Sequence, residues 1–452
     1  MANGRQANDN GNKAEQSAGS YWYSAKMLAV DVSSNKNKRM PNDPKTFSWP
    51  KQGVTRVPYR VYDDPEIFAR EQALLFRGPT WNYLGLDCEI PKAGDYKLNF
   101  VGDTPVILCR DEHGEVHAMV NRCAHRGSLV CIEKQGNREQ LTCVYHNWSY
   151  NLRGDLMSVA FKRGVRGKGG MPSDFDNAKH GLERLRVASF HGIHFGTFSE
   201  ATPPIEQYLG PVMSAYLKRI YERPMKVIGA HSQYLKNNWK LVMENVRDPY
   251  HASILHLFFG SFGLSRQTMK GEALLDDSGW HHLVYTKRGT DDIRGTEYEG
   301  NKLPNMKSHL KLNDPKILEE WPEFPDGITN MVQTVFPTVT FQQISNCLGV
   351  RHIVPRGPNE CEWFWTLLGY EDDEPWQTRI RARQANLIGP AGFISMEDGA
   401  VTNFVQRGIR GGGSDALAVL EMGGGHTVSG EDRVTESTIR GFWKAYRETM
   451  GL

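Results

Sequence analysis

The distribution of apolar and polar positions divides this chain of 452 residues into four parts. Residues 1–48 carry few apolar side chains and form a polar arm that cannot bury enough surface to fold alone. Residues 49–79 show helical spacing, residues 80–200 show short alternating or apolar runs, and residues 201–452 mix helical segments with strands. The pattern predicts a small all-β domain followed by a larger α+β domain with an antiparallel sheet flanked by helices.

The clearest helix signal lies in the segment 49–79. Asp64 stands at the N-cap position, Pro65 occupies the first helical position, and apolar residues recur at helical spacing until Gly78. We therefore expect a helix over residues 65–77, in a segment that packs on the C-terminal domain. Strand signals are strongest over residues 105–109, 348–355 and 363–369.

The composition disfavours two classes of partner. The formal net charge is only +2, and no block of Arg and Lys is interleaved with aromatic residues, which argues against nucleic acid. No run reaches the roughly 18 apolar residues of a membrane span, and the N-terminus lacks the apolar core of a signal peptide. Seven cysteines, an odd number, fit reduced thiols better than a disulfide framework. We expect a soluble protein of the cytoplasm with no membrane partner.

Two short boxes of cysteine and histidine carry the strongest chemical signal. They are Cys123-Ala-His125 and Cys143-Val-Tyr-His146, with 17 residues between them. A Rieske-type [2Fe-2S] centre needs this mixture, because one iron takes both thiolates, the other takes both imidazoles, and each loop supplies one ligand to each iron. A Cys2His2 zinc site is the alternative, although zinc modules usually place two cysteines in one box and two histidines in the other.

A second candidate metal site follows in the segment 244–256. His251 and His256, with a distant acid, would supply a mononuclear Fe(II) site that leaves positions open for O2 and substrate. On an ideal helix, a spacing of five residues separates two side chains by about 140°, so the helix must be distorted here, and Pro249 supplies a reason. Buried histidines satisfied by hydrogen bonds are the alternative.

Together, these motifs resemble those of the Rieske non-haem iron ring-hydroxylating oxygenases, specifically their large or α subunit. The resemblance implies a Rieske [2Fe-2S] domain over residues 80–200 and a catalytic mononuclear iron domain over residues 201–452. It places the third iron ligand on Asp398, in the motif Gly389–Asp398, with Glu397 as the competing candidate.

The resemblance also makes Asp248 a bridging carboxylate, which links His146 of one subunit to His251 of the next. A hydrogen-bonded path of this kind explains an acid three residues before a ligand histidine. The alternative is an N-cap just before Pro249, and both roles can hold together. Asn245 in the same segment is the other candidate catalytic residue.

The two centres together describe an oxygenase driven by an external reductant. Activation of O2 needs two electrons, of which the cluster stores one and Fe(II) supplies the other. No dinucleotide-binding fingerprint follows a strand, so we expect a separate NAD(P)H-dependent reductase, acting directly or through a ferredoxin. By resemblance, a small β subunit completes an α3β3 assembly.

Within the family, the chain is most similar to the group that acts on aromatic carboxylates, and above all to terephthalate dioxygenases. Salicylate hydroxylases and anthranilate or ortho-halobenzoate dioxygenases are related. The resemblance places two carboxylate-binding arginines on Arg351 and Arg433, and a guanidinium fork suits this task. Either arginine could instead form an ordinary salt bridge.

Three hypotheses for the function of the whole chain remain open at this point. The first is cis-dihydroxylation of terephthalate or a similar acid. The second is a salicylate- or anthranilate-type reaction on an ortho-substituted benzoate with the same two metals. The third, from another class, is a Rieske electron-transfer protein with a degenerate second domain.

Overall fold

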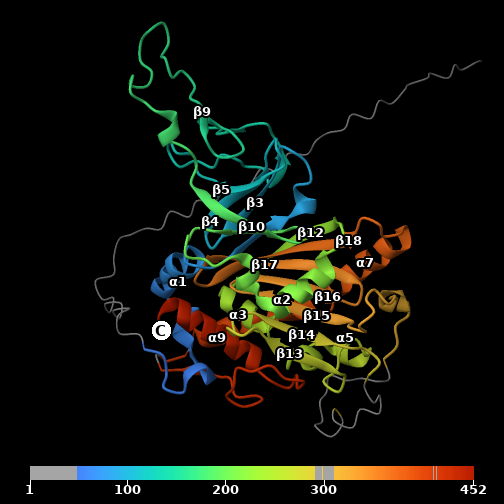
Figure 1. Cartoon of the computed structure of the whole chain (residues 1–452). Coiled ribbons are helices and arrows are strands. Elements are labelled where there is room, and N and C mark those ends of the chain that lie inside the picture. The colour runs from blue at the N-terminus through green and yellow to red at the C-terminus, as the bar shows by residue number, and fades with distance from the viewer. Residues whose placement is uncertain (1–47, 291–297, 299–309, 411, 414) are drawn as a thin grey trace, which may run out of the picture. The chain divides into compact units, whose positions relative to one another are not determined.

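The computed structural model describes residues 48–290, 298, 310–410, 412–413 and 415–452. The predicted polar arm therefore lies outside the described residues, apart from Ser48. Within the described part of the chain, the strands form two seven-stranded sheets, a three-stranded sheet and a two-stranded sheet, all with antiparallel pairing (Figure 1).

The first large sheet has the strand order β2-β11-β10-β5-β4-β3-β6. The run predicted over residues 105–109 is the centre of β4. The small sheet has the order β7-β8-β9. The strands of the two sheets are β2 (Asn82–Leu86), β3 (Asp95–Val101), β4 (Thr104–Arg110), β5 (Val116–Val120), β6 (Gln135–Asn137), β7 (Leu141–Thr142), β8 (Ser149–Tyr150), β9 (Leu156–Ser158), β10 (Arg184–Phe190) and β11 (Ile193–Thr197).

The second large sheet has the order β12-β18-β17-β16-β15-β14-β13. Two neighbouring strands of this sheet, β17 and β18, contain the strands predicted over residues 348–355 and 363–369. Its strands are β12 (Met225–Leu235), β13 (Gly271–Leu275), β14 (His282–Thr286), β15 (Asn330–Val335), β16 (Val339–Ile344), β17 (Cys347–Gly357) and β18 (Glu360–Tyr370), while β1 (Arg56–Pro58) pairs with β19 (Leu417–Val419).

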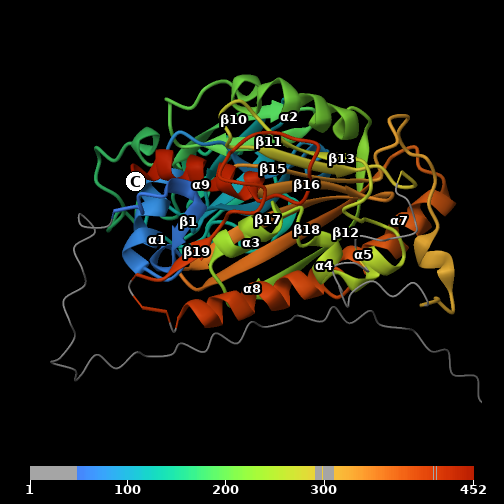
Figure 2. The same cartoon turned by 90° about the horizontal axis from the view of Figure 1, so that it is seen from below.

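Helices cover both faces of this second sheet. Figure 2 shows α2 along one face and α8 along the other. The helices are α1 (Pro65–Glu71), α2 (Ile205–Tyr221), α3 (Trp239–Asn245), α4 (Ala252–Leu255), α5 (Leu257–Ser261), α7 (Pro375–Ile388), α8 (Ser395–Ile409) and α9 (Ser437–Met450).

The two faces of β18 pack against different helices. Leu368 and Tyr370 belong to the apolar core that contains α2. Trp363 and Trp365 belong to the core that contains α3 and α9. Because side chains alternate along a strand, burial of both faces explains why β18 reads as an almost continuous apolar run.

The predicted N-terminal helix is present. Asp64 Oδ1 accepts hydrogen bonds from the backbone N–H groups of Glu66 at 2.8 Å and Ile67 at 3.3 Å, which caps α1. After α1 the chain widens into a π-helical turn over Gln72–Phe76, so the helical segment ends two residues before Gly78.

A buried ion pair ties α1 to α3 and α9. Lys240 Nζ lies 2.5 Å from Glu71 Oε1, and both side chains are almost completely buried. Trp239 Nε1 donates to Glu71 Oε2 at 2.8 Å, and the Tyr446 hydroxyl donates to Glu71 Oε1 at 2.6 Å. The acid thus has a charge partner and two donors, which a buried carboxylate requires.

We predict that Lys240→Met destabilises the fold, because it leaves the Glu71 carboxylate buried without a counter-charge. The expected loss is about 3–5 kcal/mol in the free energy of unfolding, measured by chemical denaturation. Lys218→Met removes the exposed α2 pair with Glu222 and should cost less than about 1 kcal/mol. Equal losses in the two variants would show that the buried pair does not anchor α3.

Candidate metal centre and substrate cavity

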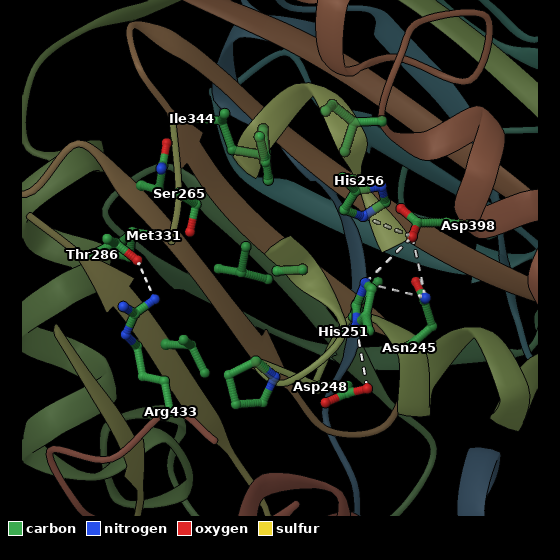
Figure 3. Close-up of a pocket in the computed structure, with 18 of the residues that line it drawn as sticks. Asn245, Asp248, His251, His256, Ser265, Thr286, Met331, Ile344, Asp398 and Arg433 are labelled. Atoms are coloured by element: carbon green, nitrogen blue, oxygen red, sulfur yellow. Dashed lines mark hydrogen bonds and ion pairs between the residues drawn. The ribbon is translucent and has the colours of Figure 1, made fainter. Parts of the chain in front are cut away.

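Three side chains that are far apart in sequence converge on one point. His251 Nε2 lies 3.4 Å from Asp398 Oδ1, and His256 Nε2 lies 3.2 Å from the same oxygen. Asn245 Nδ2 donates to this oxygen at 3.2 Å. Figure 3 shows the two imidazoles and the carboxylate pointing toward one another at one side of a cavity. The structure therefore brings together the two histidines and the acid that the sequence singled out.

Two breaks in the chain direct the histidines. The helix α3 ends at Asn245, and the chain turns through Pro249 before α4 begins after His251. A second break falls at His256 itself, whose extended backbone (φ −86°, ψ 91°) separates α4 from α5. The sequence explained the distortion by Pro249 alone. That explanation is incomplete, because Pro249 accounts only for the break before His251.

Two further carboxylates hold the outer ring nitrogens. His256 Nδ1 lies 2.7 Å from Glu397 Oε2, and His251 Nδ1 lies 3.3 Å from Asp248 Oδ2. Glu397 thus orients His256 from outside the cluster, while its neighbour Asp398 faces both inner nitrogens. A carboxylate on the far nitrogen of a metal-binding histidine fixes its tautomer and its orientation.

Asp248 also shapes the turn that it begins. Its Oδ1 accepts from the backbone N–H of Tyr250 at 2.8 Å, which leaves Oδ2 for His251. Asp248 thus closes a turn and contacts the His251 imidazole, while the helix N-cap weighed from the sequence is not formed, because no helix begins at Pro249.

The charged side chains around His251 shift one another's pKa values. Burial lowers the pKa of His251, but the carboxylates of Asp248 and Asp398 outweigh it and raise the pKa to about 10. Burial raises the pKa of Asp398, yet His256 and His251 hold it well below its usual range. Buried carboxylates of this kind require positive charge nearby, from a proton or from a metal ion.

This donor set fits a mononuclear metal ion. One ligand atom each from His251, His256 and Asp398 lies within 4.8 Å of the others. Two imidazole nitrogens and one carboxylate oxygen match the facial triad of non-haem Fe(II).

The two cysteine and histidine boxes form a matched pair of loops. In the first loop, the Cys123 N–H donates to Ser128 O at 2.8 Å, and the Gly127 N–H donates to Cys123 O at 3.0 Å. The second loop repeats both bonds, from Cys143 to Trp148 and from Asn147 to Cys143, at 2.9 Å each.

The conformation of these loops explains two of their residues. Gly127 and Asn147 occupy the same place in each loop and have positive φ angles of 74° and 52°. Glycine and asparagine are the residues that tolerate this region of backbone space.

The four predicted cluster ligands lie at the tips of these loops. The thiols of Cys123 and Cys143 are buried, and the rings of His125 and His146 lie 4.6 Å apart between centroids. All seven cysteines are free thiols, so no disulfide competes for the pair. The two buried thiols and the two outward imidazoles fit a Rieske [2Fe-2S] cluster, which they would hold with one pair of ligands for each iron.

The cavity next to the His251 cluster carries both predicted arginines. Arg351 is 5% exposed, and its guanidinium lies 5.2 Å from the ring centroid of Trp365. Arg433 lies across the cavity from His256 and donates to the Thr286 hydroxyl at 3.0 Å (Figure 3). The lining consists of Asn245, Val246, Asp248, Pro249, His251, Ala252, His256, Phe259, Ser265, Val284, Thr286, Asn330, Met331, Val332, Ile344, Arg351, Ile394, Asp398 and Arg433.

The two arginines differ in their partners. One Arg433 nitrogen, Nη2, faces the carbonyl oxygens of Arg266 at 2.5 Å, Met269 at 2.7 Å and Gln267 at 3.3 Å. Among the described residues Arg351 has no hydrogen bond or ion pair, and its Nε is buried without an acceptor. Burial lowers the pKa of Arg351 to about 10, so the group stays charged near neutral pH.

Comparison with known proteins agrees with this two-centre arrangement. Residues 80–166 match the family profile described as Rieske [2Fe-2S] domain, and residues 217–452 match the profile described as ring hydroxylating alpha subunit (catalytic domain).

Curated relatives match almost the whole chain. The α 2 subunit of the terminal oxygenase component of terephthalate 1,2-dioxygenase from Comamonas sp. is 49% identical over 90% of this chain and 98% of its own length. The large subunit of anthranilate 1,2-dioxygenase from Burkholderia cepacia is 44% identical over 91% and 97%. The large oxygenase component of salicylate 5-hydroxylase from Ralstonia sp. is 40% identical over 91% and 97%.

A solved structure shares the fold. Naphthalene 1,2-dioxygenase from Rhodococcus sp., bound to indole, superposes with a TM-score of 0.72, at 23% identity, over 87% of this chain and 94% of the other. The chain belongs to the family of Rieske non-haem iron ring-hydroxylating oxygenases, as an α subunit. The predicted fold class, enzyme class and both cofactors are confirmed. Separately, no helix among the described residues has the length and hydropathy to cross a bilayer.

We predict a pH-dependent stability from Glu244, which anchors α3 one residue before Asn245. Its Oε1 accepts from the Tyr62 hydroxyl at 2.7 Å and from Trp443 Nε1 at 2.5 Å. Burial raises the pKa of Glu244 to about 7. The folded protein therefore holds a proton that the unfolded chain releases near pH 4.5, and folding loses stability as the pH rises through this window.

Glu244→Gln keeps both acceptor contacts and removes the titration. The stability of the variant relative to the native protein should rise between about pH 4.5 and 7 and then level off, by up to about 3 kcal/mol. Urea unfolding across this pH range checks it, with the exposed Glu222→Gln as control. Parallel stability curves for the native protein and Glu244→Gln would contradict the prediction.

Proposed function

We propose that this chain hydroxylates the ring of an aromatic carboxylate, with terephthalate as the leading candidate. The observation that carries the substrate class is Arg351, a charged and buried guanidinium that lines the cavity together with His256 and Asp398 and forms no hydrogen bond or ion pair among the described residues. A buried charge without a partner is costly, and a ligand carboxylate would satisfy it.

In this proposal His251, His256 and Asp398 hold the iron. Glu397 keeps Nδ1 of His256 engaged, so that Nε2 faces the metal position. Asn245 donates to Asp398 Oδ1 and so fixes the rotation of that carboxylate. When bound, Fe(II) activates O2 with the help of an electron from the cluster.

The [2Fe-2S] cluster is held by Cys123, His125, Cys143 and His146. The electron passes from this cluster to the iron site through Asp248. Asp248 contacts His251 through Oδ2 and is 19% exposed, which leaves room for a donor from outside. We propose that this donor is His146 of a neighbouring copy, in an α3β3 assembly with a small β subunit. An NAD(P)H-dependent reductase supplies the electrons, directly or through a ferredoxin.

A second candidate is an ortho-substituted benzoate, as in salicylate or anthranilate. Terephthalate needs both Arg351 and Arg433 as carboxylate partners. The Nη2 atom of Arg433 already faces three carbonyl oxygens and Nη1 donates to Thr286, so few N–H groups are left for a second carboxylate.

The bridge is tested by Asp248→Asn. The amide keeps an oxygen for the Tyr250 N–H but loses the negative charge beside His251. We expect both metals to remain, as iron analysis and visible absorption will show. Oxidation of the reduced cluster during turnover should slow at least about 100-fold. Glu436→Gln serves as a control, because this acid accepts from the Met422 N–H and not from an imidazole. Native turnover by Asp248→Asn would rule out the bridge.

The substrate class is tested by arginine variants and a panel of acids. NADH and O2 consumption with a reductase should be coupled to product for at least one of terephthalate, phthalates, salicylate, anthranilate and 2-halobenzoates. Arg351→Met should raise KM for every accepted acid about 10- to 100-fold, since a charge-assisted fork is lost. Arg433→Met should raise KM for terephthalate alone.

Each part of the proposal can fail separately in this experiment. Absence of coupled turnover with every acid would overturn the carboxylate class. Unchanged terephthalate affinity in Arg433→Met would overturn terephthalate in favour of a monocarboxylate. Product mass with labelled O2 separates incorporation of one oxygen atom from incorporation of two.

A further inference from the structure

A row of polar side chains crosses the sheet face that carries Arg351. Thr340 on β16 pairs directly with Arg351 on β17, and Arg351 pairs with Trp365 on β18. Directly paired residues of antiparallel strands project from the same face of a sheet. Gln342 lies two residues beyond Thr340, so it projects from this face as well, diagonally across from Arg351.

Gln342 is not itself a lining residue of the cavity, but its neighbours on this sheet face are. Val332 is its direct partner on β15, and Ile344 is the next residue of the same face along β16. Both line the cavity, as does Arg351. The direct partner on the other side is Gly349, which has no side chain to cover the amide: a Cβ there would lie 3.7 Å from Gln342 Nε2.

The polar atoms of this row are buried without partners. Gln342 is 1% exposed and Thr340 is fully buried. Both amide atoms of Gln342, the Thr340 hydroxyl and Nε of Arg351 have no hydrogen-bond partner among the described residues. Each unsatisfied buried group destabilises the fold, so a cluster of them on the face that carries the cavity calls for a partner, which a polar ligand would supply.

The adjacent glutamine on the opposite face behaves differently. Gln343 Nε2 donates to Ile328 O at 3.0 Å and to Ser345 O at 3.2 Å. Its Oε1 accepts from Arg219 Nη1 at 2.7 Å. Burial in this sheet therefore does not by itself leave both atoms of a glutamine amide unpaired. Gln333, on the same face as Gln343, lacks a partner only for Oε1, whereas Gln342 lacks one for both atoms.

The chemistry of the row selects a particular kind of ligand. Arg351 offers donors only, Thr340 offers a hydroxyl, and Gln342 offers an N–H2 donor and a carbonyl acceptor. A carboxylate, which only accepts, would pair with Arg351, with the Thr340 O–H and with Gln342 Nε2, but would leave Gln342 Oε1 unpaired. A hydroxyl or amino group on the ring carbon next to the carboxylate would donate to Oε1.

We infer that Gln342, assisted by Thr340, is a specificity-determining residue that selects an aromatic carboxylate with a hydrogen-bond donor ortho to the carboxylate. This inference deepens the proposed function and rests on it, because it takes the carboxylate to be held by Arg351. It favours the second candidate substrate, a 2-hydroxy- or 2-aminobenzoate, over terephthalate and over benzoate, which have no such donor.

The test compares binding of four acids to the reduced holoenzyme without O2, by calorimetry. The ligands are benzoate, 2-hydroxybenzoate, 2-aminobenzoate and terephthalate. In the native enzyme we expect the two ortho-substituted acids to bind at least about tenfold more tightly than benzoate. Gln342→Met, which keeps the volume and removes the amide, should reduce this preference to about one.

Two further variants separate the roles within the row. Gln343→Met changes the neighbouring glutamine on the other face and should preserve the preference. Thr340→Val should weaken all four acids by a similar factor, about 5- to 10-fold, because it removes a donor to the carboxylate. Cluster absorption and iron content verify that each variant is assembled.

The outcomes distinguish the inference from the proposal beneath it. Retention of the ortho preference in Gln342→Met would overturn the inference, as would equal binding of benzoate and 2-hydroxybenzoate by the native enzyme. In both cases the carboxylate class would stand. Failure of the native enzyme to bind any of the four acids would overturn the proposed function, and the inference with it.

Discussion

The chemistry of this protein depends on one buried carboxylate. Asp398 lies between the inner nitrogens of His251 and His256, and its oxygen also accepts from Asn245. Asp248 and Glu397 hold the outer nitrogens, so neither ring can rotate without losing a charged partner. The site is therefore shaped in advance for a metal ion, because its ligands are oriented by contacts that do not involve the metal.

The fold supports this site because contacts with α1 and α9 fix the position of α3. Glu71 and Lys240 connect α1 to α3, and Glu244 connects α3 to α9 through Trp443. The Glu71–Lys240 ion pair and the hydrogen-bonded Glu244 are buried, which makes α3 costly to displace. Asn245 and the turn at Asp248 follow directly, so the anchored helix determines where the metal ligands begin.

The two faces of the second sheet differ in how the glutamines of β16 are paired. Arg351 lines the cavity and Gln342 lies on the same face with both amide atoms unpaired, while Gln343 on the other side of β16 pairs with carbonyls and with Arg219. Strand β16 thus packs apolar side chains against α2 from one face and carries polar side chains on the other, which is the face of the cavity. Its period of two makes this division possible.

The sequence by itself determined the class of protein and the residues that we expect to hold its two metal centres. Spacing along the chain is a local property. It therefore predicted the two boxes at Cys123 and Cys143, the pair His251 and His256, and the helix cap at Asp64. The buried strands β17 and β18 could be read as well, because burial of both faces leaves an apolar run.

Only the tertiary structure decided which residues, distant in sequence, contact one another at the site. It separated Asp398 from Glu397, which are adjacent in sequence but face different atoms of the same cluster. It showed that Arg433 is engaged by carbonyls while Arg351 is not, and that Gln342 shares a face with Arg351. Sequence could not supply these distinctions, because they depend on strand register and on the break at His256, where packing rather than local preference sets the backbone.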